Sequence, residues 1–598
     1  MSKKTRLIFY DFEVFKEDWL VCLTDYSTKQ ECVIVNDRNK LIRLYNKFKD
    51  NTIFIGFNNR HYDDVIFKGI LMNMNPKEIN DKLIEGKKPH EISRTFNKIK
   101  LYSYDTLILN KSLKQLELFM GSNIKETDVP FDIDRKLTMK EIEETIKYCK
   151  HDVSETIKVF EATINDFKAH KSLIEKFNLP INSFSKTKAK LSAEILEAER
   201  QHGVTDGLEY EFLPTIKLNK YKYIQDWFDT HREYTYVNEK GTNKKMQLET
   251  EVFGINTIYG FGGLHSARKK YFHKVEENEL IVHSDVASFY PSIMRNYKLL
   301  SRAVHKPEKF NEIMDERLRL KALGDKKGQA PLKIVINATY GICKDKWSKM
   351  FDEKRANEIC INCQLFLTDL LEKLETSNLD LELIQANTDG IIVLLRNKNE
   401  FEQYKAICQE WEIRTGFKLE HDLIKNIMQK DVNNYIFEFE NGKLERKGAY
   451  VKEYSLIDNN LSIITDAVVE YLLHETPVEE TINNCDELIK FQMCCKIGST
   501  YNYMMWGDKI LNTKCNRVFA TTKDLPGLSK VKCNFKNKKG EVADKIEKVA
   551  STPEKVMIYN EEVIDKSVLE VLPELDKQFY IDLAKKRLKD FGIKFIKS

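Results

Sequence analysis

Acidic side chains near the start of the chain have a spacing that could bind metal ions. In FYDFEVF, Asp11 and Glu13 lie two positions apart, and a strand would project both carboxylates from one face. Like charges on one face repel each other, so solvent must screen them or a cation must neutralise them. A solvated strand edge is the simpler interpretation of this pair when it is taken alone.

Three further polar groups complete this first set. Asp63 follows the next expected strand, in GFNNRHYDD, where Asn58 or Asn59 precedes it. In the expected helix EIEETIKYCKHDVSETIKVF, Tyr148 and Asp152 lie four positions apart and share a face. A charged surface helix would explain that segment by itself. Together, however, the strand pair, the loop acid and the helix pair could hold two divalent cations and orient water for attack on a phosphodiester.

A second pair of acids lies farther along the chain. Asp285 ends a buried-looking strand in HSDVASFYPSIM, and Pro291 suits the first turn of the helix that follows. A carboxylate there must be hydrated, paired or bound to a metal. QANTDGIIV predicts a β-hairpin with Asp-Gly in its turn, which places Asp389 at the tip. A plain hairpin explains Asp389 alone, because Asp-Gly reverses a strand at little cost.

Basic and polar side chains lie between these two acids. In PLKIVINATYG, a helix that starts near Pro331 would carry one stripe of four residues: Lys333, Asn337, Tyr340 and Gly341. Upstream, Arg317 and Lys321 lie one helical turn apart, before an expected break at LGDKKG. An amphipathic stripe and an exposed basic face are the simpler interpretations. The alternative is that these side chains meet a phosphate group.

The order of these motifs resembles that of one enzyme family. The D-x-E, Asn-to-Asp and Y-x-x-x-D elements resemble the 3′–5′ proofreading exonuclease of DNA polymerases. D-x-x-S-F-Y-P-S, K-x-x-x-N-x-x-Y-G and NTDG resemble the palm and fingers motifs of family B DNA polymerases of the bacteriophage type. The resemblance runs over essentially the whole chain. One departure is Asn387, which stands where the family's hairpin usually has Asp.

The resemblance implies roles in an exonuclease site. The metal ligands would be Asp11, Glu13, Asp63 and Asp152, and Tyr148 would orient the attacking water. Asn59, preferred to Asn58, would contact single-stranded DNA. Either Ser112 of SLKQLE or Thr106 of DTL would do the same, and the sequence does not decide between them.

The resemblance also implies roles in a polymerase site. The metal ligands would be Asp285, Val286 and Asp389. Lys333, Arg317 and Lys321 would meet the triphosphate. Tyr290 would lie under the sugar and exclude ribonucleotides, while Asn337 and Tyr340 would line the new base pair. The expected DNA contacts are Tyr259, Gly262, Gly263, Gly341, Thr388, Lys447 and Tyr450. Gly262 and Gly263 could equally form a flexible joint, and Gly448 and Ala449 loosen the family's K-x-Y spacing around Lys447 and Tyr450.

The implied fold class is α/β and α+β multidomain, with a ribonuclease H-like exonuclease domain and a right-hand polymerase. The boundaries follow changes of pattern along the chain. We expect an exonuclease domain over 1–165, a helical connecting region over 166–250, palm over 251–305 and 346–455, fingers over 306–345, and thumb with the C-terminal region over 456–598.

Composition agrees with a soluble multidomain protein. A chain of 598 residues is too long to fold around a single hydrophobic core. Its 96 basic and 92 acidic side chains give a net charge of +4, which by itself predicts no nucleic-acid partner. Residues 501–550 are locally basic, which a solvated face or a phosphate-binding surface would explain. We expect reduced cysteines, with a structural metal at Cys360 and Cys363 as the alternative. No apolar run is long enough to span a membrane, and no secretory leader is evident, so we expect a cytoplasmic location, that of a bacterial host if the protein is viral.

The resemblance therefore implies a template-directed DNA polymerase with proofreading, acting in replication of a phage-type genome. We expect two Mg²⁺ in each site, with Mn²⁺ as a substitute. The expected partners are primer-template DNA, dNTPs and a single-stranded 3′ end, and the candidate protein partners are a helicase, a single-strand-binding protein or a clamp. We expect a monomer that extends a nucleic-acid primer. The rivals are a nuclease with an inactive polymerase half, which Asn387 favours, and a scaffold that grips primer-template DNA through residues 501–550.

Overall fold

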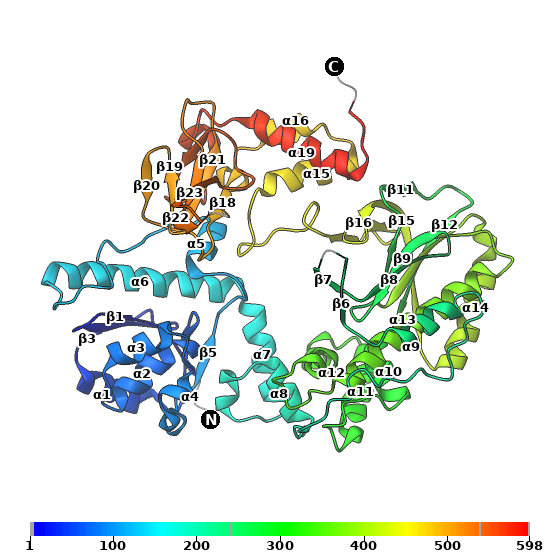
Figure 1. Cartoon of the computed structure of the whole chain (residues 1–598), viewed down its shortest axis with the longest axis horizontal. Helices are drawn as coiled ribbons and strands as arrows, with labels where there is room; N and C mark the ends of the chain where they lie inside the picture. Colours follow the sequence, from blue (N-terminus) through cyan, green and yellow to red (C-terminus); the bar gives the residue numbers. More distant parts are fainter. Residues whose placement is uncertain (1–4, 240, 537–539, 596–598) are drawn as a thin grey trace. The chain divides into compact units, whose positions relative to one another are not determined.

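The computed structural model describes residues 5–239, 241–536 and 540–595 (Figure 1). The chain divides into two compact units, one of Met1–Lys186 with Tyr454–Ala584 and one of Thr187–Glu453 with Lys585–Ser598. Both units contain helices and strands, so the predicted mixed α/β class is confirmed. The finer division into exonuclease, palm, fingers and thumb stays a prediction.

A five-stranded sheet in the order β3-β2-β1-β4-β5 forms the centre of the first unit. Strand β1 pairs antiparallel with β2 and parallel with β4. The strands are β1 (Arg6–Val14), β2 (Trp19–Asp25), β3 (Glu31–Val35), β4 (Thr52–Gly56) and β5 (Ser103–Asp105). Alternate residues of β1, among them Phe12, pack into the apolar core, and the intervening residues, Asp11 and Glu13, therefore point to the other face.

Helices of the first unit carry the remaining acids of the first set. Helix α6 packs on β1 and β2, and its start is fixed by a capping box between Thr138 and Glu141. The helices are α1 (Arg38–Phe48), α2 (Asp63–Leu71), α3 (Pro76–Ile84), α4 (Pro89–Ile92), α5 (Leu113–Met120), α6 (Met139–Ala162) and α7 (Ile164–Lys176), with 3-10 turns η1 (Asn59–His61), η2 (Arg94–Lys98) and η3 (Ile181–Ser185). Asp63 is the first residue of α2, so the prediction that it lies in a loop is wrong.

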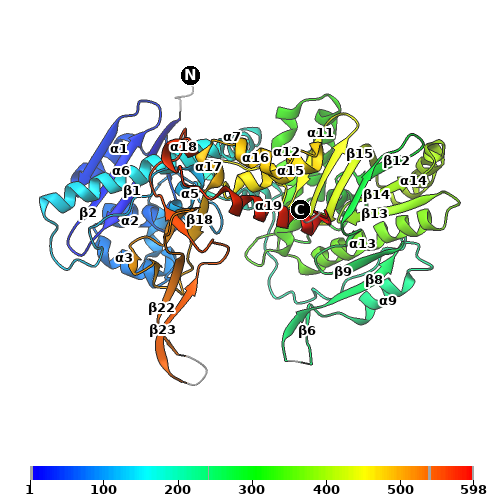
Figure 2. The same cartoon turned by 90° about the horizontal axis from the view of Figure 1, so that it is seen from above.

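The C-terminal part of the first unit adds two small sheets, in the orders β18-β21-β24 and β20-β19-β22-β23. Figure 2 shows β22 and β23 as a long two-stranded ribbon. The elements are α15 (Ser462–His474), α16 (Val478–Asn484), α17 (Leu488–Phe491), β18 (Met493–Lys496), β19 (Tyr503–Trp506), β20 (Lys509–Leu511), β21 (Cys515–Ala520), β22 (Leu528–Lys536), β23 (Val542–Lys548), β24 (Val556–Ile558), α18 (Val568–Val571) and α19 (Lys577–Phe591), which belongs to the second unit from Lys585 on.

A fully buried arginine ties this C-terminal part to helix α5. The guanidinium of Arg517 donates to the backbone carbonyls of Leu118 and Ser122, at 3.2 and 2.9 Å, and to the side chain of Gln492 at 2.8 Å. A buried charge of this kind is tolerated only when its donors are satisfied. The C-terminal segment is thus anchored on the helix that follows Ser112.

A ten-stranded sheet forms the core of the second unit. Its main path is β17-β16-β15-β12-β14-β13-β10-β9-β8, and β11 pairs with β15. Figure 2 shows β12, β13 and β14 side by side. The strands of this unit are β6 (Thr235–Val237), β7 (Asn243–Lys245), β8 (Gln247–Val252), β9 (Ile255–Gly260), β10 (His265–Ala267), β11 (Tyr271–Lys274), β12 (Leu280–Val286), β13 (Leu381–Asn387), β14 (Gly390–Leu395), β15 (Leu419–Asp431), β16 (Asn434–Phe439) and β17 (Leu444–Lys447), of which β6 and β7 pair separately.

The helices of the second unit include the expected helical pair, with its break at Leu323–Asp325. They are α8 (Lys188–Ile195), α9 (Lys222–Thr230), α10 (Phe289–Asn296), α11 (Pro307–Ala322), α12 (Lys326–Lys344), α13 (Glu353–Glu375) and α14 (Phe401–Thr415), with a 3-10 turn η4 (Lys398–Glu400). The prediction that α12 starts near Pro331 is wrong: the side chain of Asp325 caps the helix earlier by accepting from the Gly328 N–H at 2.8 Å. Pro331 lies inside the helix.

The hairpin turn also differs from the expectation. Thr388 and Asp389 form the turn, whereas Gly390 already pairs in β14 opposite Asn387. Thr388 adopts the positive φ of 43° that a tight turn demands. The predicted hairpin is therefore confirmed, but its turn is Thr-Asp rather than Asp-Gly.

The described helices include none with the length and apolar composition of a membrane-spanning helix. All twelve cysteines are free, and Cys360 and Cys363 are both buried within α13.

Candidate active sites

The second unit contains a cavity of about 450 Å³ at the end of β12. We call it the Asp285–Asp389 pocket. Residues from strands β12 and β15, helices α10, α11 and α12, and the hairpin turn line it: Asp285, Val286, Ala287, Ser288, Phe289, Tyr290, Pro291, Arg317, Lys321, Lys333, Asn337, Thr388, Asp389 and Glu420. Segments more than 130 positions apart, from Asp285 to Glu420, thus meet at one site.

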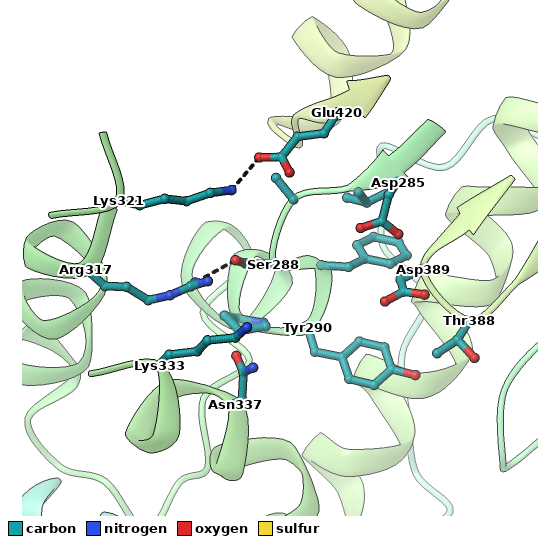
Figure 3. A pocket seen from close by; sticks show the side chains of 14 residues that line it. Asp285, Ser288, Tyr290, Arg317, Lys321, Lys333, Asn337, Thr388, Asp389 and Glu420 are labelled. Carbon is teal, nitrogen blue, oxygen red and sulfur yellow. Dashed lines mark hydrogen bonds and ion pairs between the residues drawn. The ribbon is translucent and has the colours of Figure 1, made fainter. Parts of the chain in front are cut away.

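Strand pairing places the two acids of this pocket together. Asp285 pairs opposite Gly390, so the neighbouring Asp389 lies beside its carboxylate (Figure 3). The backbone N–H of Val286 donates to the Asp389 carbonyl at 2.8 Å, which fixes the turn against β12. Gly390 leaves room for this arrangement, because a Cβ there would lie 3.0 Å from Asp285 Oδ1.

Both carboxyls bind protons more tightly than usual. Burial, followed by the charges of Asp389 and Glu420, raises the pKa of Asp285 to about 7. Burial also raises the pKa of Asp389. Crowded carboxylates of this kind are stabilised by a divalent cation, and oxygen ligands of this class suit Mg²⁺, so the residues present fit the expected metal.

Three cations face these acids from helices α11 and α12 (Figure 3). Arg317 is buried and donates to Ser288 Oγ at 2.7 Å, and burial lowers the pKa of its guanidinium. Lys321 Nζ lies 2.6 Å from Glu420 Oε1. Lys333 is exposed at the rim, and among the described residues it has no acidic partner within ion-pair distance. The pocket therefore has an acidic side and a basic side.

Tyr290 lies on the floor of this pocket, with its hydroxyl beneath Asp389 in Figure 3. Its ring centroid is 4.3 Å from that of Tyr340. Asn337 lines the pocket, whereas Tyr340 packs behind Tyr290, and Gly341 is exposed on α12. Lys333 and Asn337 of the expected stripe therefore line the pocket, whereas Tyr340 and Gly341 do not, and Tyr340 supports the ring of Tyr290.

The loop before β10 lies beside the hairpin turn. The Thr388 N–H donates to the Leu264 carbonyl at 3.1 Å, and a Cβ on Gly263 would lie 3.8 Å from Thr388 Oγ1. Gly262 is exposed. Tyr259, in contrast, is fully buried and bonded to Thr368 Oγ1 at 2.9 Å. The prediction that the Tyr259 side chain contacts DNA is therefore wrong, because the alternation of β9 turns this ring inward.

Lys447 and Tyr450 lie at the end of β17. Lys447 is exposed, whereas the Tyr450 hydroxyl donates to Asp590 Oδ2 at 2.8 Å. Gly448 has a φ of +95°, and a Cβ there would lie 2.0 Å from the Asn433 carbonyl oxygen. Gly448, which alters the spacing between Lys447 and Tyr450, thus lies in a turn that requires glycine.

Asn387 makes a contact that the sequence did not indicate. Its Oδ1 lies 2.9 Å from Nδ1 of His265, which comes from the neighbouring strand β10. Ser288 and Glu420 are further pocket residues that sequence reasoning missed. Ser288 lies within the S-F-Y-P-S motif, but nothing in the sequence pairs Glu420 with Lys321.

The first unit contains a second group of acids, which we call the amino-terminal acid cluster: Asp11, Glu13, Asp63 and Asp152. Asp63 Oδ1 accepts from the Phe12 N–H at 3.0 Å, which ties the start of α2 to β1. Burial, followed by the charge of Asp152, raises the pKa of Asp11 to about 8. Burial and the neighbouring acids likewise raise the pKa of Glu13 and of Asp63. This crowding fits divalent cations.

A lysine that no sequence motif indicates reaches this cluster. Lys114 Nζ on α5 lies 2.7 Å from Asp152 Oδ1 and 3.0 Å from Glu117 Oε1. It also lies 4.8 Å from the centroid of the Tyr148 ring. The i, i+3 spacing of Lys114 and Glu117 signals only a local pair, because the approach of α6 is a tertiary feature.

The expected single-strand contacts divide into exposed and buried residues. Asn59 is fully buried, and its Nδ2 donates to Asp64 Oδ1 at 3.2 Å, so its predicted contact with DNA is wrong for this arrangement. Asn58, the alternative, is half-buried with a φ of 60°. Thr106 is buried, and its hydroxyl donates to the Gly56 carbonyl at 2.9 Å. Ser112 is more accessible and accepts from Lys496 Nζ at 3.2 Å.

Comparisons with known proteins give little beyond this geometry. No protein-family model matches the chain, and no curated protein matches it. Among solved structures, the chain is similar to the family B DNA polymerase from the hyperthermophilic archaeon Pyrobaculum calidifontis. The sequence identity is 12%, the match covers 100% of this chain and 79% of that chain, and the TM-score is 0.43. A similarity of this degree does not establish an activity for this chain.

Proposed function

We propose that this protein is a template-directed DNA polymerase with a 3′–5′ proofreading exonuclease, acting in replication of a phage-type genome. The Asp285–Asp389 pocket is the observation that carries the proposal. It combines two crowded carboxylates with three cations on the opposing side, from separate segments of the chain. Nucleotidyl transfer requires this division, because a triphosphate must be neutralised while a primer hydroxyl is positioned.

In this proposal each pocket residue has a distinct task. Asp285 and Asp389, with the Val286 carbonyl, would hold Mg²⁺, which when bound lowers the charge of the phosphates and activates the primer hydroxyl. Lys333, Arg317 and Lys321 would bind the triphosphate oxygens. Tyr290, held in place by Tyr340, would close the floor beneath the sugar and select deoxynucleotides.

The amino-terminal acid cluster supports a separate nuclease activity. Asp11, Glu13, Asp63 and Asp152 would hold Mg²⁺ or Mn²⁺, and Tyr148 would orient the water that attacks the terminal phosphodiester. Lys114 would hold Asp152 through their 2.7 Å contact. Ser112, which is partly accessible and is the N-cap residue of α5, would contact the single-stranded 3′ end.

Point variants separate the two activities. Asp285→Ala or Asp389→Ala is expected to abolish extension of a primed template with dNTPs while leaving degradation of a single-stranded 3′ end. Asp11→Ala with Glu13→Ala is expected to do the reverse. Loss of both activities in a folded Asp285→Ala protein would contradict the proposal that synthesis and degradation take place at two independent sites.

The second candidate is a nuclease with an inactive polymerase half. Asn387 favours it, because an amide stands where the family's hairpin usually has an acid. This candidate predicts that wild-type protein degrades a primer but never extends it. The same extension assay, with the Asp11→Ala, Glu13→Ala protein to prevent degradation, separates the two candidates.

A further inference from the structure

A second group of potential metal ligands lies beside the amino-terminal acid cluster. Glu117 of α5 and His151 and Asp152 of α6 each offer one ligand atom, and these atoms all lie within 4.8 Å of one another. Glu117 is fully buried, and the side chains of His151 and Asp152 are 14% and 12% exposed. Neither Glu117 nor His151 is among the residues to which the motifs of the proposed nuclease site assign a role.

Two polar atoms of this group lack a hydrogen-bond partner among the described residues. They are Glu117 Oε2 and His151 Nε2, both of which are buried. A buried carboxylate oxygen without a partner is costly, so its environment is incomplete as it stands. These two atoms face each other at 3.7 Å, which is too far for a hydrogen bond. Two ligands that bind one zinc ion at about 2.0–2.2 Å can be separated by this distance.

Lys114, which lies beside this group, does not supply the missing hydrogen bonds. Lys114 Nζ contacts Glu117 Oε1 and Asp152 Oδ1, at 3.0 and 2.7 Å, and leaves the other Glu117 oxygen and the imidazole nitrogen unpaired. Its ammonium therefore compensates part of the acidic charge. It also lies close enough to oppose a second cation by electrostatic repulsion.

We propose that Glu117, His151 and Asp152 form an additional cation site for a transition metal of the Zn²⁺ type. An imidazole with two carboxylates is a donor set that zinc accepts, whereas Mg²⁺ prefers oxygen ligands alone. Three protein ligands would leave a further position for water. The ion would share Asp152 with the amino-terminal acid cluster and would compete with Lys114 for it.

The direct test is zinc binding by the full-length protein. Isothermal titration with Zn²⁺, after the accessible thiols have been blocked, is expected to reveal a site that His151→Ala weakens by at least about 10-fold. Glu117→Gln should weaken it as well. The matched control is His90→Ala, which removes an exposed imidazole from helix α4 of the same unit and should leave this binding unchanged.

A gain of affinity provides an independent readout. Lys114→Met removes the competing ammonium with little change of side-chain length, so it should tighten zinc binding several-fold. A merely structural lysine would give no gain. Circular dichroism of each variant shows whether it is folded, and His151→Gln replaces His151→Ala if the smaller side chain unfolds the protein.

Cobalt identifies the ligand type. Co²⁺ bound by the proposed residues should give visible bands without thiolate charge-transfer absorption, and these bands should be lost in His151→Ala. Equal zinc affinity in wild type and His151→Ala, or cobalt spectra of the thiolate type, would overturn the proposal. These measurements need no enzymatic activity.

One consequence rests on the proposed nuclease function. Because Asp152 is shared, zinc should slow degradation of a 3′ end in wild type, and the ratio of rates with and without zinc should be closer to unity in His151→Ala. If the protein degrades no DNA, the proposed nuclease function fails, and the titration alone decides the metal site.

Discussion

Crowding of Asp285 and Asp389 should destabilise the protein when no metal is bound. The pKa of Asp285 rises from an ordinary 3.8 to about 7, with burial as the first cause and Asp389 as the second. An acid whose pKa is higher in the folded state weakens folding as pH rises through that interval, because the folded state then must ionise it. Asp389→Asn should therefore stabilise the metal-free protein at pH 8.

The size of the effect follows from the shift. A rise of about 3 pKa units corresponds to at most about 4 kcal/mol at pH 8. Because solvent screens part of this half-buried carboxyl, we expect roughly half of that free energy. Since Asp389 is only the second cause, its removal should recover about 1 kcal/mol. A gain of this size raises the unfolding temperature of a unit this large by about 2–4 °C.

Thermal unfolding at pH 5 and pH 8, in EDTA and in Mg²⁺, measures this prediction. Asp389→Asn should unfold at a higher temperature than wild type in EDTA at pH 8, and the difference should be small at pH 5. Mg²⁺ should stabilise wild type more than the variant. Asp422→Asn is the matched control, because this exposed acid contributes least among the charges that raise the Asp285 pKa. Equal unfolding temperatures in EDTA at pH 8, or an equal response to Mg²⁺, would refute the reasoning.

Three further predictions concern the same pocket. Tyr290→Ala should raise ribonucleotide incorporation by orders of magnitude and cost less in dNTP incorporation, as measured by single-nucleotide kinetics; unchanged sugar discrimination would reject the role of Tyr290. Asn387→Asp should lower the Mg²⁺ concentration needed for synthesis, because it adds a negative charge near Asp389 and beside His265, 2.9 Å away; an unchanged Mg²⁺ titration would place residue 387 outside the electrostatic reach of the metals. Gly390→Ala should reduce primer extension and leave 3′-end degradation intact, because its Cβ would lie 3.0 Å from Asp285 Oδ1 and 3.2 Å from the Ser284 carbonyl oxygen; wild-type extension rates in that variant would show that the Asp285 carboxylate has room to move.

The sequence predicts elements whose signals are local. The strand that ends near Asp285, the hairpin at Asp389 and the long helix with Tyr148 and Asp152 all have the expected type and place. Each depends on the periodicity of a short segment and on nearby turn residues. The resemblance then joined these segments into two sites.

Details that depend on pairing or tertiary contact could not be predicted. The turn at Thr388–Asp389 follows from the register of β13 with β14, which a two-residue motif does not reveal. Burial of Tyr259 and Asn59 depends on what packs against them. Lys114 and Glu420 reach their sites from segments distant in sequence, at 2.7 Å from Asp152 and 2.6 Å from Lys321. No local pattern carries that information.

Template-directed synthesis by the Asp285–Asp389 pocket is the central claim, and single-nucleotide incorporation tests it most directly. The Asp11→Ala, Glu13→Ala protein is mixed with Mg²⁺, one dNTP and a primer annealed to each of four templates that differ in the next base. We predict extension by one nucleotide only where the dNTP is complementary to the template, and none after Asp389→Ala. Absence of incorporation on all four templates, or incorporation that ignores the template base, would contradict the account.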